Sequence, residues 1–257
     1  MYRTSIFLLV FMTLASCKEQ GKETETRWQT KKLAEANKAH NQLFAIEKEQ
    51  GWQLLFDGET LDGWHLYNKA DSTAHAAWEV RDGMLFCNAT DENRVHGDLV
   101  TDQDFEDYEL AFDWKIATRG NSGIFINVQE APEYATAYQT GPEYQLLEPS
   151  HMDTDVGVKR PGCLYGFSEQ LNTVEANPAG QWNHSRIVQR QGKIEFYLNG
   201  KLTATEDFSS ASWKAKVDAN GFSRFPAYGQ ATKGKIALQN WYFEVWFRNM
   251  KIREIPS

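Results

Sequence analysis

From Gly51 onward, apolar residues recur at every second position, and this period most strongly limits what the chain can fold into. Segment 108–116 carries large apolar side chains at its even positions and mostly polar ones at its odd positions. Such alternation predicts a β-strand with one buried face. Segments 194–198 and 243–255 repeat the pattern, the second with an expected irregularity near Asn249.

Turn signals separate these strands. Arg81-Asp82-Gly83 lies between two short apolar runs and predicts a hairpin, and Asn199-Gly200 supplies residues that tolerate positive φ. No long helical pattern interrupts the strands after Gly51. Many short antiparallel strands with few helices predict an all-β fold, either a two-sheet sandwich or a jelly roll.

Size and charge narrow the class of protein further. The 257 residues are long enough to bury a sizeable core, and 41% hydrophobic with 24% charged residues is typical of a globular protein. No repeat or composition shift divides residues 51–257, so they are expected to form one domain. The net charge of −8 leaves no basic stripe, which argues against nucleic acid as a partner.

The N-terminus predicts export. Arg3 precedes a short apolar run over 6–14, and the run ends in Leu14-Ala15-Ser16-Cys17, which looks like a bacterial lipobox. Residues 1–17 are therefore expected to be a lipoprotein signal peptide, with Cys17 lipidated and the protein held in the periplasm or at the outer membrane. The alternative is cleavage elsewhere, with Cys17 incidental.

Residues 18–50 differ from the domain in composition, since Lys, Glu, Gln, Thr and Ala dominate. Their first part is expected to be a flexible tether. Farther on, apolar residues fall at helical spacing and predict a short amphipathic helix that lies against the domain. These positions are Leu33, Ala36, Ala39, Leu43 and Ile46.

The two cysteines after Cys17 leave two alternatives. Cys87 and Cys163 are able to pair in an exported protein, or they remain free and buried. No Cys/His cluster with metal-ligand spacing is present, so no zinc site is predicted. The nine Trp residues likewise either fill a large sandwich core or offer flat surfaces for sugar rings.

The segment Glu143-Tyr144-Gln145-Leu146-Leu147-Glu148 is the first candidate for chemistry. Pleating places Glu143 and Gln145 on one face, and Glu148 joins them only if a β-bulge intervenes. Paired carboxylates serve acid–base work on carbohydrates. Gln145 does not titrate, which weighs against a double-displacement glycosidase. The alternative is a polar strand face with a carboxylate at its rim.

The segment that precedes this strand adds polar candidates. Asn121-Ser122-Gly123 opens an apolar run, and Asn127 is expected near Glu143 if the two strands are neighbours. Arg119 is positioned to clamp a hydroxyl or a developing oxyanion, or is simply a solvated loop residue.

His151, Asp153 and Asp155 follow in a charged loop. Three alternatives are open for this cluster: it binds calcium, it contains a catalytic base, or its charges are simply exposed to solvent. Histidine is a poor calcium ligand. His151 is nevertheless the best histidine candidate for proton transfer, because its unperturbed pKa lies near neutrality. No phosphate loop, serine-nucleophile elbow or zincin motif is present.

Several short motifs occur in a fixed order along residues 51–255 and together resemble the 3-keto-disaccharide hydrolase family. They are Leu55-Phe56-Asp57-Gly58, Gly120-Asn121-Ser122-Gly123-Ile124-Phe125, Glu143-Tyr144-Gln145, Gly162-Cys163-Leu164-Tyr165-Gly166, Gly180-Gln181-Trp182-Asn183, Leu198-Asn199-Gly200 and Val245-Trp246-Phe247-Arg248-Asn249.

This resemblance implies a concanavalin A-like antiparallel jelly-roll sandwich and activity on glycosides already oxidised to a ketone at C3. The ketone acidifies the C2 hydrogen, so a base removes it, and the enolate expels the C1 substituent before water adds. Such a site needs a base near C2, donors around the C3 oxygen and an acid near the leaving oxygen.

The resemblance also implies roles for single residues. Glu143 matches the strand glutamate and is expected to act as the base or to position the substrate. Gln145 and Asn121 match polar positions that hold hydroxyls or the oxyanion. Arg248 matches the arginine of a Phe-Arg-Asn motif, with either a substrate-binding or a structural role.

The chain departs from the family pattern in two places. Asn127 stands where the family often has Arg, and Asn240-Trp241 stands where it often has Asp-His. The second change removes a metal-binding or acid–base pair from that position and makes Trp241 a candidate stacking wall.

The expected protein is thus a lipid-anchored enzyme that cleaves 3-keto-glycosides by elimination or net hydrolysis. Glu143 and His151 are the catalytic candidates, and the substrate-binding candidates are Asn121, Asn127, Gln145, Glu148, Arg119, Trp241 and Arg248. A non-catalytic carbohydrate-binding lipoprotein is the alternative, and a flat aromatic face without convergent acids would favour it. No cofactor is predicted, calcium is left open, and the oligomeric state is not determined.

Overall fold

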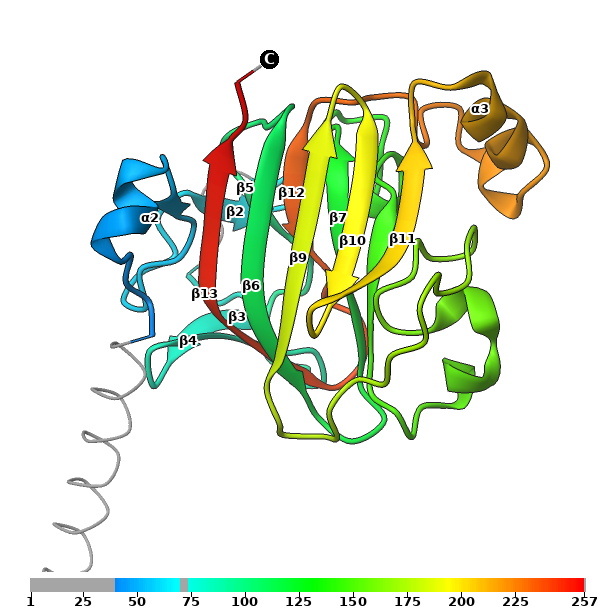
Figure 1. Ribbon diagram of the computed structural model, residues 1–257. Helices are drawn as coiled ribbons and strands as arrows, with labels where there is room; N and C mark the ends of the chain where they lie inside the picture. Colours follow the sequence, from blue (N-terminus) through cyan, green and yellow to red (C-terminus); the bar gives the residue numbers. More distant parts are fainter. Residues whose placement is uncertain (1–39, 70–73, 257) are drawn as a thin grey trace, which may run out of the picture.

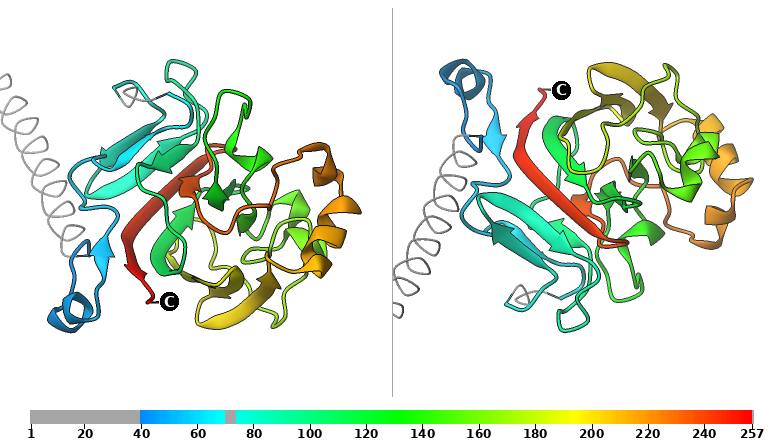
Figure 2. Two further views of the ribbon diagram at one scale, coloured as in Figure 1. Left: turned by 90° about the horizontal axis from the view of Figure 1, so that it is seen from above. Right: turned by 90° about the horizontal axis from the view of Figure 1, so that it is seen from below.

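The computed structural model describes residues 40–69 and 74–256. In this part of the chain, two antiparallel sheets pack face to face, and Figures 1 and 2 show the two layers from the front and from both ends. The strands are β1 (Gln53–Leu54), β2 (Trp64–Leu66), β3 (Trp78–Arg81), β4 (Met84–Asn88), β5 (Leu99–Thr101), β6 (Tyr108–Ile116), β7 (Asn121–Val128), β8 (Glu143–Leu147), β9 (Asn183–Arg190), β10 (Lys193–Leu198), β11 (Lys201–Asp207), β12 (Lys235–Leu238) and β13 (Glu244–Glu254). The helices are α2 (Ala45–Glu49), α3 (Ala211–Asp218) and the 3₁₀ turns η1 (Ala137–Gln139), η2 (Met152–Asp155), η3 (Gly157–Lys159) and η4 (Gly221–Arg224).

The two sheets draw their strands from all parts of the domain. Sheet A has the order β11-β10-β9-β6-β13-β4-β3, with β1 also paired to β13, and sheet B has the order β2-β5-β12-β7-β8. The C-terminal strand β13 therefore lies between β6 and β4, in the near layer of Figure 1. The expected all-β, two-sheet antiparallel sandwich is confirmed.

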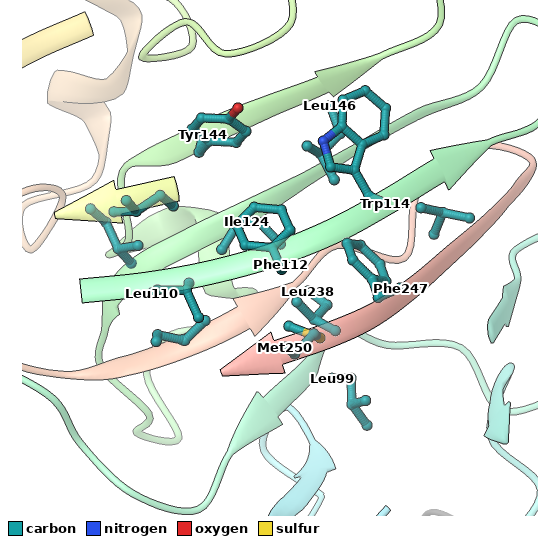
Figure 3. Packing of buried hydrophobic residues seen from close by; sticks show 14 of the residues in the cluster. Leu99, Leu110, Phe112, Trp114, Ile124, Tyr144, Leu146, Leu238, Phe247 and Met250 are labelled. Atoms are coloured by element: carbon teal, nitrogen blue, oxygen red, sulfur yellow. The ribbon is translucent and has the colours of Figure 1, made fainter. Parts of the chain in front are cut away.

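Large apolar side chains fill the space between the sheets. Phe112 and Trp114 of β6 and Phe247 of β13 face Ile124 of β7 and Leu146 of β8, and all five are at most 1% exposed (Figure 3). These are the inward positions that the two-residue period of the sequence predicts, because alternate residues of a strand point to opposite faces.

One polar bridge crosses this apolar layer. The indole N–H of Trp114 donates to Ser185 Oγ at 2.8 Å, and the Tyr144 hydroxyl lies 2.7 Å from the same oxygen. Tyr144 also donates to the carbonyl of Tyr197 at 3.0 Å, so Ser185 donates to Tyr144 and accepts from Trp114. The bridge ties β8 of sheet B to β6 and β9 of sheet A.

The turns and the irregular strand occur where the sequence predicts them. Asn199 and Gly200 take φ values of 47° and 81° in the hairpin between β10 and β11, and Asp82 adopts a φ of 52° between β3 and β4. Asn249 has a φ of 52°, and the pairing of β13 with β6 shifts register between Arg248 and Lys251. In the two hairpins, left-handed residues give a turn whose twist matches that of the paired strands, and at Asn249 they accommodate the irregular pairing of β13 with β6.

The segment before β1 differs from expectation. Only α2 is helical among the described residues of this segment, and Ile46, expected on its packed face, is 58% exposed. Polar contacts attach the segment instead: Asn41 donates to the carbonyl of Gly83 at 2.7 Å, and Lys251 pairs with Glu47. Leu43, also expected on the helix, precedes α2 and is half-buried, whereas Leu33, Ala36, Ala39 and Cys17 lie outside the described residues.

Cys87 and Cys163 are both buried and free, so the expectation of unpaired cysteines is confirmed over their possible pairing. Among residues 40–69 and 74–256, no helix combines the length and the apolar character that crossing a membrane requires.

The Ser185 bridge generates a stability prediction. Ser185→Ala leaves the buried N–H of Trp114 without its acceptor, so we expect the free energy of unfolding to fall by about 1–3 kcal/mol. Ser168→Ala is the matched control, because its hydroxyl is buried and has no hydrogen-bond partner within the described part of the chain. Chemical denaturation measures both variants, and equal losses would contradict the assigned role of the bridge.

Candidate active site

The outer face of sheet B carries Glu143 because its neighbours on β8 belong to the core. Tyr144 and Leu146 point inward and are fully buried, so Glu143 and Gln145 point outward. β8 pairs with β7 in unbroken register, with Glu143 opposite Phe125. Glu143 is only 7% exposed.

Gly123 makes room for this carboxyl group. A Cβ atom at Gly123 would lie 2.1 Å from Oε1 of Glu143 and 2.8 Å from its Cδ. The Glu143 side chain therefore lies across the bare backbone of β7, and every larger residue at position 123 would displace it.

An amide row extends from the carboxyl group along the same face. One end of the Gln145 amide lies 3.0 Å from Glu143 Oε1 and 3.1 Å from the carbonyl oxygen of Ser122. Both are oxygens, which assigns the amide nitrogen to that end, where it donates to both. The other end lies 3.3 Å from the side chain of Asn121. Gln145 thus orients Glu143, and Asn121 ends the row.

A second carboxyl group, Asp98, lies within electrostatic range of Glu143, although β5, which it precedes, is separated from β8 by β12 and β7. Asp98 directly precedes β5, and its Oδ1 accepts from the backbone N–H of Asn240 at 3.0 Å. The backbone N–H of Ala137 donates to it as well. Burial raises the pKa of Asp98 to about 6, and the two N–H donors hold it below the value that burial alone would produce.

The two carboxyl groups affect each other. Burial raises the pKa of Glu143 well above its usual range, and the negative charge of Asp98 raises it further. The carboxylate form of Glu143 is therefore disfavoured by its burial and by the neighbouring charge of Asp98. Tyr228 and Tyr165 also lie within electrostatic range of Glu143. Burial is the main cause of the raised pKa of each, and the Glu143 carboxylate raises both further, although Lys159 opposes the shift of Tyr165.

Asp98 was not among the sequence candidates. The strand that follows it, β5, is only three residues long and has no clear alternation, so no local pattern marks Asp98 as outward-facing. The only signal is its position two residues before Val100, which packs on the same outer face with Tyr67 and Phe125.

Glu148 does not join Glu143. The pairing of β7 with β8 shows no bulge, so the condition for bringing both glutamates to one face is not met. The carboxylate of Glu148 instead accepts from the backbone N–H of Arg119 at 2.8 Å and of Ser150 at 3.0 Å. Burial opposes ionisation, but the hydrogen bond from the Ser150 hydroxyl and these backbone bonds outweigh it and lower the pKa of Glu148. Glu148 therefore fixes loops rather than substrate.

Three other candidates share a separate cavity of about 410 Å³. Arg119, His151 and Trp241 line it together with Met152 and Tyr242. Nδ1 of His151 accepts from the N–H of Asp153 at 3.1 Å, and the carboxylate of Asp153 pairs with Lys159 at 3.0 Å.

These contacts also bear on a metal site. Nδ1 of His151 and the carboxylate of Asp153 are thus engaged within the loop. Nowhere in residues 40–69 and 74–256 do three or more His, Cys, Asp or Glu side chains cluster as metal ligands.

Asn127 is turned away from Glu143. The pairing of β7 with β12 shifts register between Lys235 and Ala237, and Asn127 adopts a φ of 57°. Its amide consequently exchanges hydrogen bonds with Gln189 of β9 at 2.7 and 3.1 Å, inside the sandwich. The prediction that Asn127 lies near Glu143 was wrong because this irregularity reverses the direction of its side chain.

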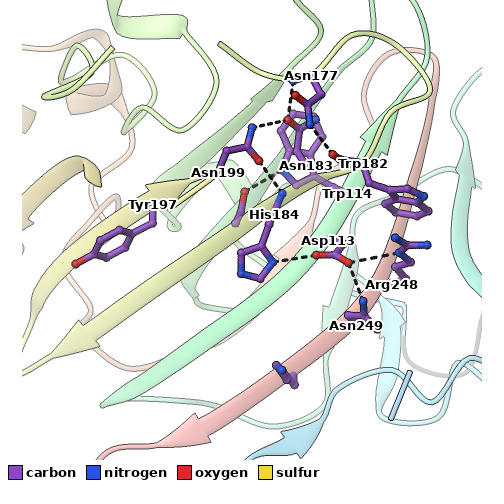
Figure 4. Close-up of polar contacts among 12 residues, drawn as sticks. Asp113, Trp114, Asn177, Trp182, Asn183, His184, Tyr197, Asn199, Arg248 and Asn249 are labelled. Carbon is purple, nitrogen blue, oxygen red and sulfur yellow. Dashed lines mark hydrogen bonds and ion pairs between the residues drawn. The ribbon is translucent and has the colours of Figure 1, made fainter. Parts of the chain in front are cut away.

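Arg248 lies on the outer face of the other sheet. Figure 4 shows its guanidinium beside Asp113, at 3.4 Å, and over the ring of Trp182, at 3.9 Å from the ring centroid. Asp113 also pairs with His184 at 2.9 Å. Of its two expected roles, the structure supports the structural one.

The described geometry agrees with comparisons to known proteins. A family model described as the 3-keto-alpha-glucoside-1,2-lyase-like domain matches residues 51–253. The chain belongs to this family. Within the 3-keto-alpha-glucoside-1,2-lyase-like family, a curated relative from Bacteroides thetaiotaomicron, named 3-keto-disaccharide hydrolase, is 27% identical over 228 residues, which cover 79% of this chain and 78% of the relative.

Two solved structures of similar proteins are described as glycosyl hydrolases. A provisionally assigned glycosyl hydrolase from Parabacteroides distasonis is 32% identical, with a TM-score of 0.75 over 84% of this chain and 99% of the other. A second such protein from the same organism, 24% identical with a TM-score of 0.58, covers 79% of this chain and 99% of its own and shares the fold. The family, the curated relative and the 32% identical structure indicate a glycosyl hydrolase-like function.

The raised pKa of Asp98 generates a prediction for stability against pH. An unfolded Asp titrates near pH ~3.9. In the folded protein the pKa of Asp98 is about 6, so protonated Asp98 stabilises the fold. This contribution to the free energy of unfolding is fully present below pH about 4 and is lost as pH rises through about 6. We expect the free energy of unfolding of the wild type, measured by urea denaturation, to fall by about 2–3 kcal/mol between pH 4 and 7 relative to that of Asp98→Asn.

Asp113→Asn is the matched control with the opposite sign. Burial opposes its ionisation, but His184, Asn249 and Arg248 outweigh burial and lower the pKa of Asp113, so its contribution is lost as pH falls. Parallel pH profiles for the wild type and Asp98→Asn would contradict the assignment.

Proposed function

We propose that this protein cleaves 3-keto-glycosides and that Glu143 and Asp98 are its acid–base pair. The observation that supports this most directly is the pair itself: two largely buried carboxyl groups on one sheet face with different proton affinities. Neighbouring carboxyl groups whose pKa values are pushed apart typically divide the roles of acid and base. Membership of the family supports the keto-sugar substrate.

The roles follow from the protonation states. Asp98 is ionised at neutral pH and is assigned as the base that takes the proton from C2. The C2–H electron pair forms the enolate of the C3 ketone, and its return breaks the bond from C1 to the leaving oxygen. Glu143, whose raised pKa favours the protonated form, is assigned as the acid that donates a proton to the departing oxygen. Water then adds across C1 and C2 for net hydrolysis.

This division differs from the expectation that Glu143 is the base. The reason is its depth: at 7% exposure with Asp98 nearby, the carboxylate form of Glu143 is disfavoured. Gln145 donates to one oxygen of Glu143 and leaves the other oxygen to carry the proton. Asn121, at the end of the amide row, is assigned to a substrate hydroxyl or the C3 oxygen.

The alternative function is carbohydrate binding without catalysis, and the exposed aromatic residues of the neighbouring cavity favour it. Trp241 and Tyr242 are 63% and 49% exposed, as a sugar-stacking surface would be. A binding surface by itself, however, has no use for two neighbouring carboxyl groups with raised pKa values.

The test is release of 4-nitrophenol from 4-nitrophenyl 3-keto-glucoside, with unoxidised 4-nitrophenyl glucoside as the substrate control. We expect Glu143→Gln and Asp98→Asn each to lower kcat/KM by about 10²–10⁴-fold, the usual range for loss of a general acid or base. For the wild type, kcat/KM should rise through pH about 6 as Asp98 ionises and fall at higher pH as Glu143 loses its proton.

Glu195→Gln, an exposed glutamate on sheet A, serves as the matched variant and should keep full activity. Full activity in both site variants would rule out the assigned pair. Sugar binding without release from any keto substrate would establish the binding alternative.

Gly123 supplies a separate prediction. Gly123→Ala places a methyl group where the Glu143 carboxyl lies, so we expect kcat to fall by about 10²-fold, as for a catalytic group displaced by roughly 1 Å. Gly221→Ala is the control, because a Cβ there meets nothing within 4 Å. Unchanged kcat in a folded Gly123→Ala protein would show that the position of the Glu143 carboxyl does not matter to the reaction.

A further inference from the structure

We propose that the cavity lined by Arg119, His151, Met152, Trp241 and Tyr242 binds the leaving group of the substrate and selects an aromatic ring there. We refer to these five residues as the aromatic cavity. The inference rests on the proposed function, because it takes the carboxyl pair as the reacting centre. It adds the chemical class of the group attached to C1.

The aromatic cavity is built by three connections that meet at one end of sheet B. Arg119 precedes β7, His151 and Met152 follow β8, and Trp241 and Tyr242 follow β12. Its volume of about 410 Å³ is that of a small-ligand pocket.

The walls of the aromatic cavity are held by specific bonds. Glu148 accepts from the N–H of Arg119 through its side chain and from the N–H of His151 through its carbonyl, at 2.8 and 2.9 Å. Asn121 and Tyr242 exchange two backbone hydrogen bonds of 3.1 Å each. The cavity is therefore preorganised, although its residues come from loops.

Two chains of contacts join this cavity to the carboxyl pair. From Glu143, the amide row runs through Gln145 to Asn121, whose backbone pairs with Tyr242. From Asp98, the bond to the N–H of Asn240 ends at the residue before Trp241. A sugar ring held between the carboxyl groups would direct its C1 substituent toward a neighbouring cavity, and both contact chains lead to this one.

The lining favours a flat aromatic ring over a second sugar. Met152, Trp241 and Tyr242 are 76%, 63% and 49% exposed, so three large apolar side chains gather with no partner among the described residues that buries them. Aromatic faces and a thioether pack well against another ring. Sugar hydroxyls need acceptors as well as donors, and none of the five lining residues is a carboxylate or a carboxamide.

Arg119 adds a charge that suits such a leaving group. When the C1–O bond of an aryl glycoside breaks, the electron pair stays on the phenolic oxygen until a proton arrives from Glu143. A guanidinium always carries positive charge and stabilises an oxyanion within its reach. Arg119 is therefore assigned to the departing oxygen or to an anionic substituent on the ring.

The experiment compares 4-nitrophenyl 3-keto-glucoside with a 3-keto-disaccharide whose leaving group is glucose. We expect Trp241→Ala in the full chain to raise KM for the aryl substrate about tenfold, as for a lost ring–ring contact, with kcat little changed. The KM for the disaccharide should change less than twofold. Trp241→Phe should restore most of the aryl KM, since it keeps a ring.

Phe44→Ala, which removes an exposed ring beside α2, is the matched control and should alter neither KM. Calorimetric binding of unreactive 4-nitrophenyl glucoside gives a readout independent of turnover, and Trp241→Ala should weaken it about tenfold.

The outcomes separate the two proposals. Equal changes in KM for both substrates, or no change for either, would overturn the aromatic preference while leaving the cleavage reaction intact. Weaker aryl binding in Trp241→Ala together with no turnover of any keto substrate would uphold the aromatic cavity and reject the proposed reaction. Unchanged aryl binding would overturn the assignment of the cavity.

Discussion

The apolar layer between the two sheets is the constraint on which the rest of the structure depends. Tyr144 and Leu146 belong to that layer, and the Tyr144 hydroxyl is bonded across it to Ser185. A shift of β8 by one residue would move these side chains to the outer face and bring Glu143 and Gln145 into the core. The burial of two apolar residues therefore decides which face of sheet B carries the candidate site.

Acidic side chains on the outer faces of the two sheets have different neighbours. On sheet A, Glu109 lies between Arg186 and Arg253 at 2.8 and 2.6 Å, and Asp113 faces Arg248 and His184. Burial opposes ionisation there, but the arginines, together with His184 and Asn249 at Asp113, outweigh burial and lower the pKa of both acids. On sheet B, Glu143 and Asp98 receive hydrogen bonds from amide and backbone N–H groups.

This difference carries the functional interpretation. Burial raises the pKa values of the two carboxyl groups of sheet B, and no cation is among the causes that offset it. Raised carboxyl pKa values make the fold less stable at neutral pH. They are also what a general acid or base needs in order to work near neutral pH. The reacting centre is formed by strands, which set positions closely, whereas the aromatic cavity is formed by loops tied down at Glu148 and Asn121. Loops of this kind vary without disturbing the core, which suits a part of the site that selects the leaving group.

The sequence by itself determined the all-β class, the tight turns, the irregularity at Asn249 and the fact that Glu143 and Gln145 share one strand face. These follow from the two-residue period and from local turn chemistry, which depend only on neighbouring residues. Tertiary structure alone decided that Asp98 is the partner of Glu143, that Asn127 turns inward to Gln189 and that Glu148 holds loops. Pairing partners, register shifts and desolvation arise between strands far apart in the chain, so no local pattern records them.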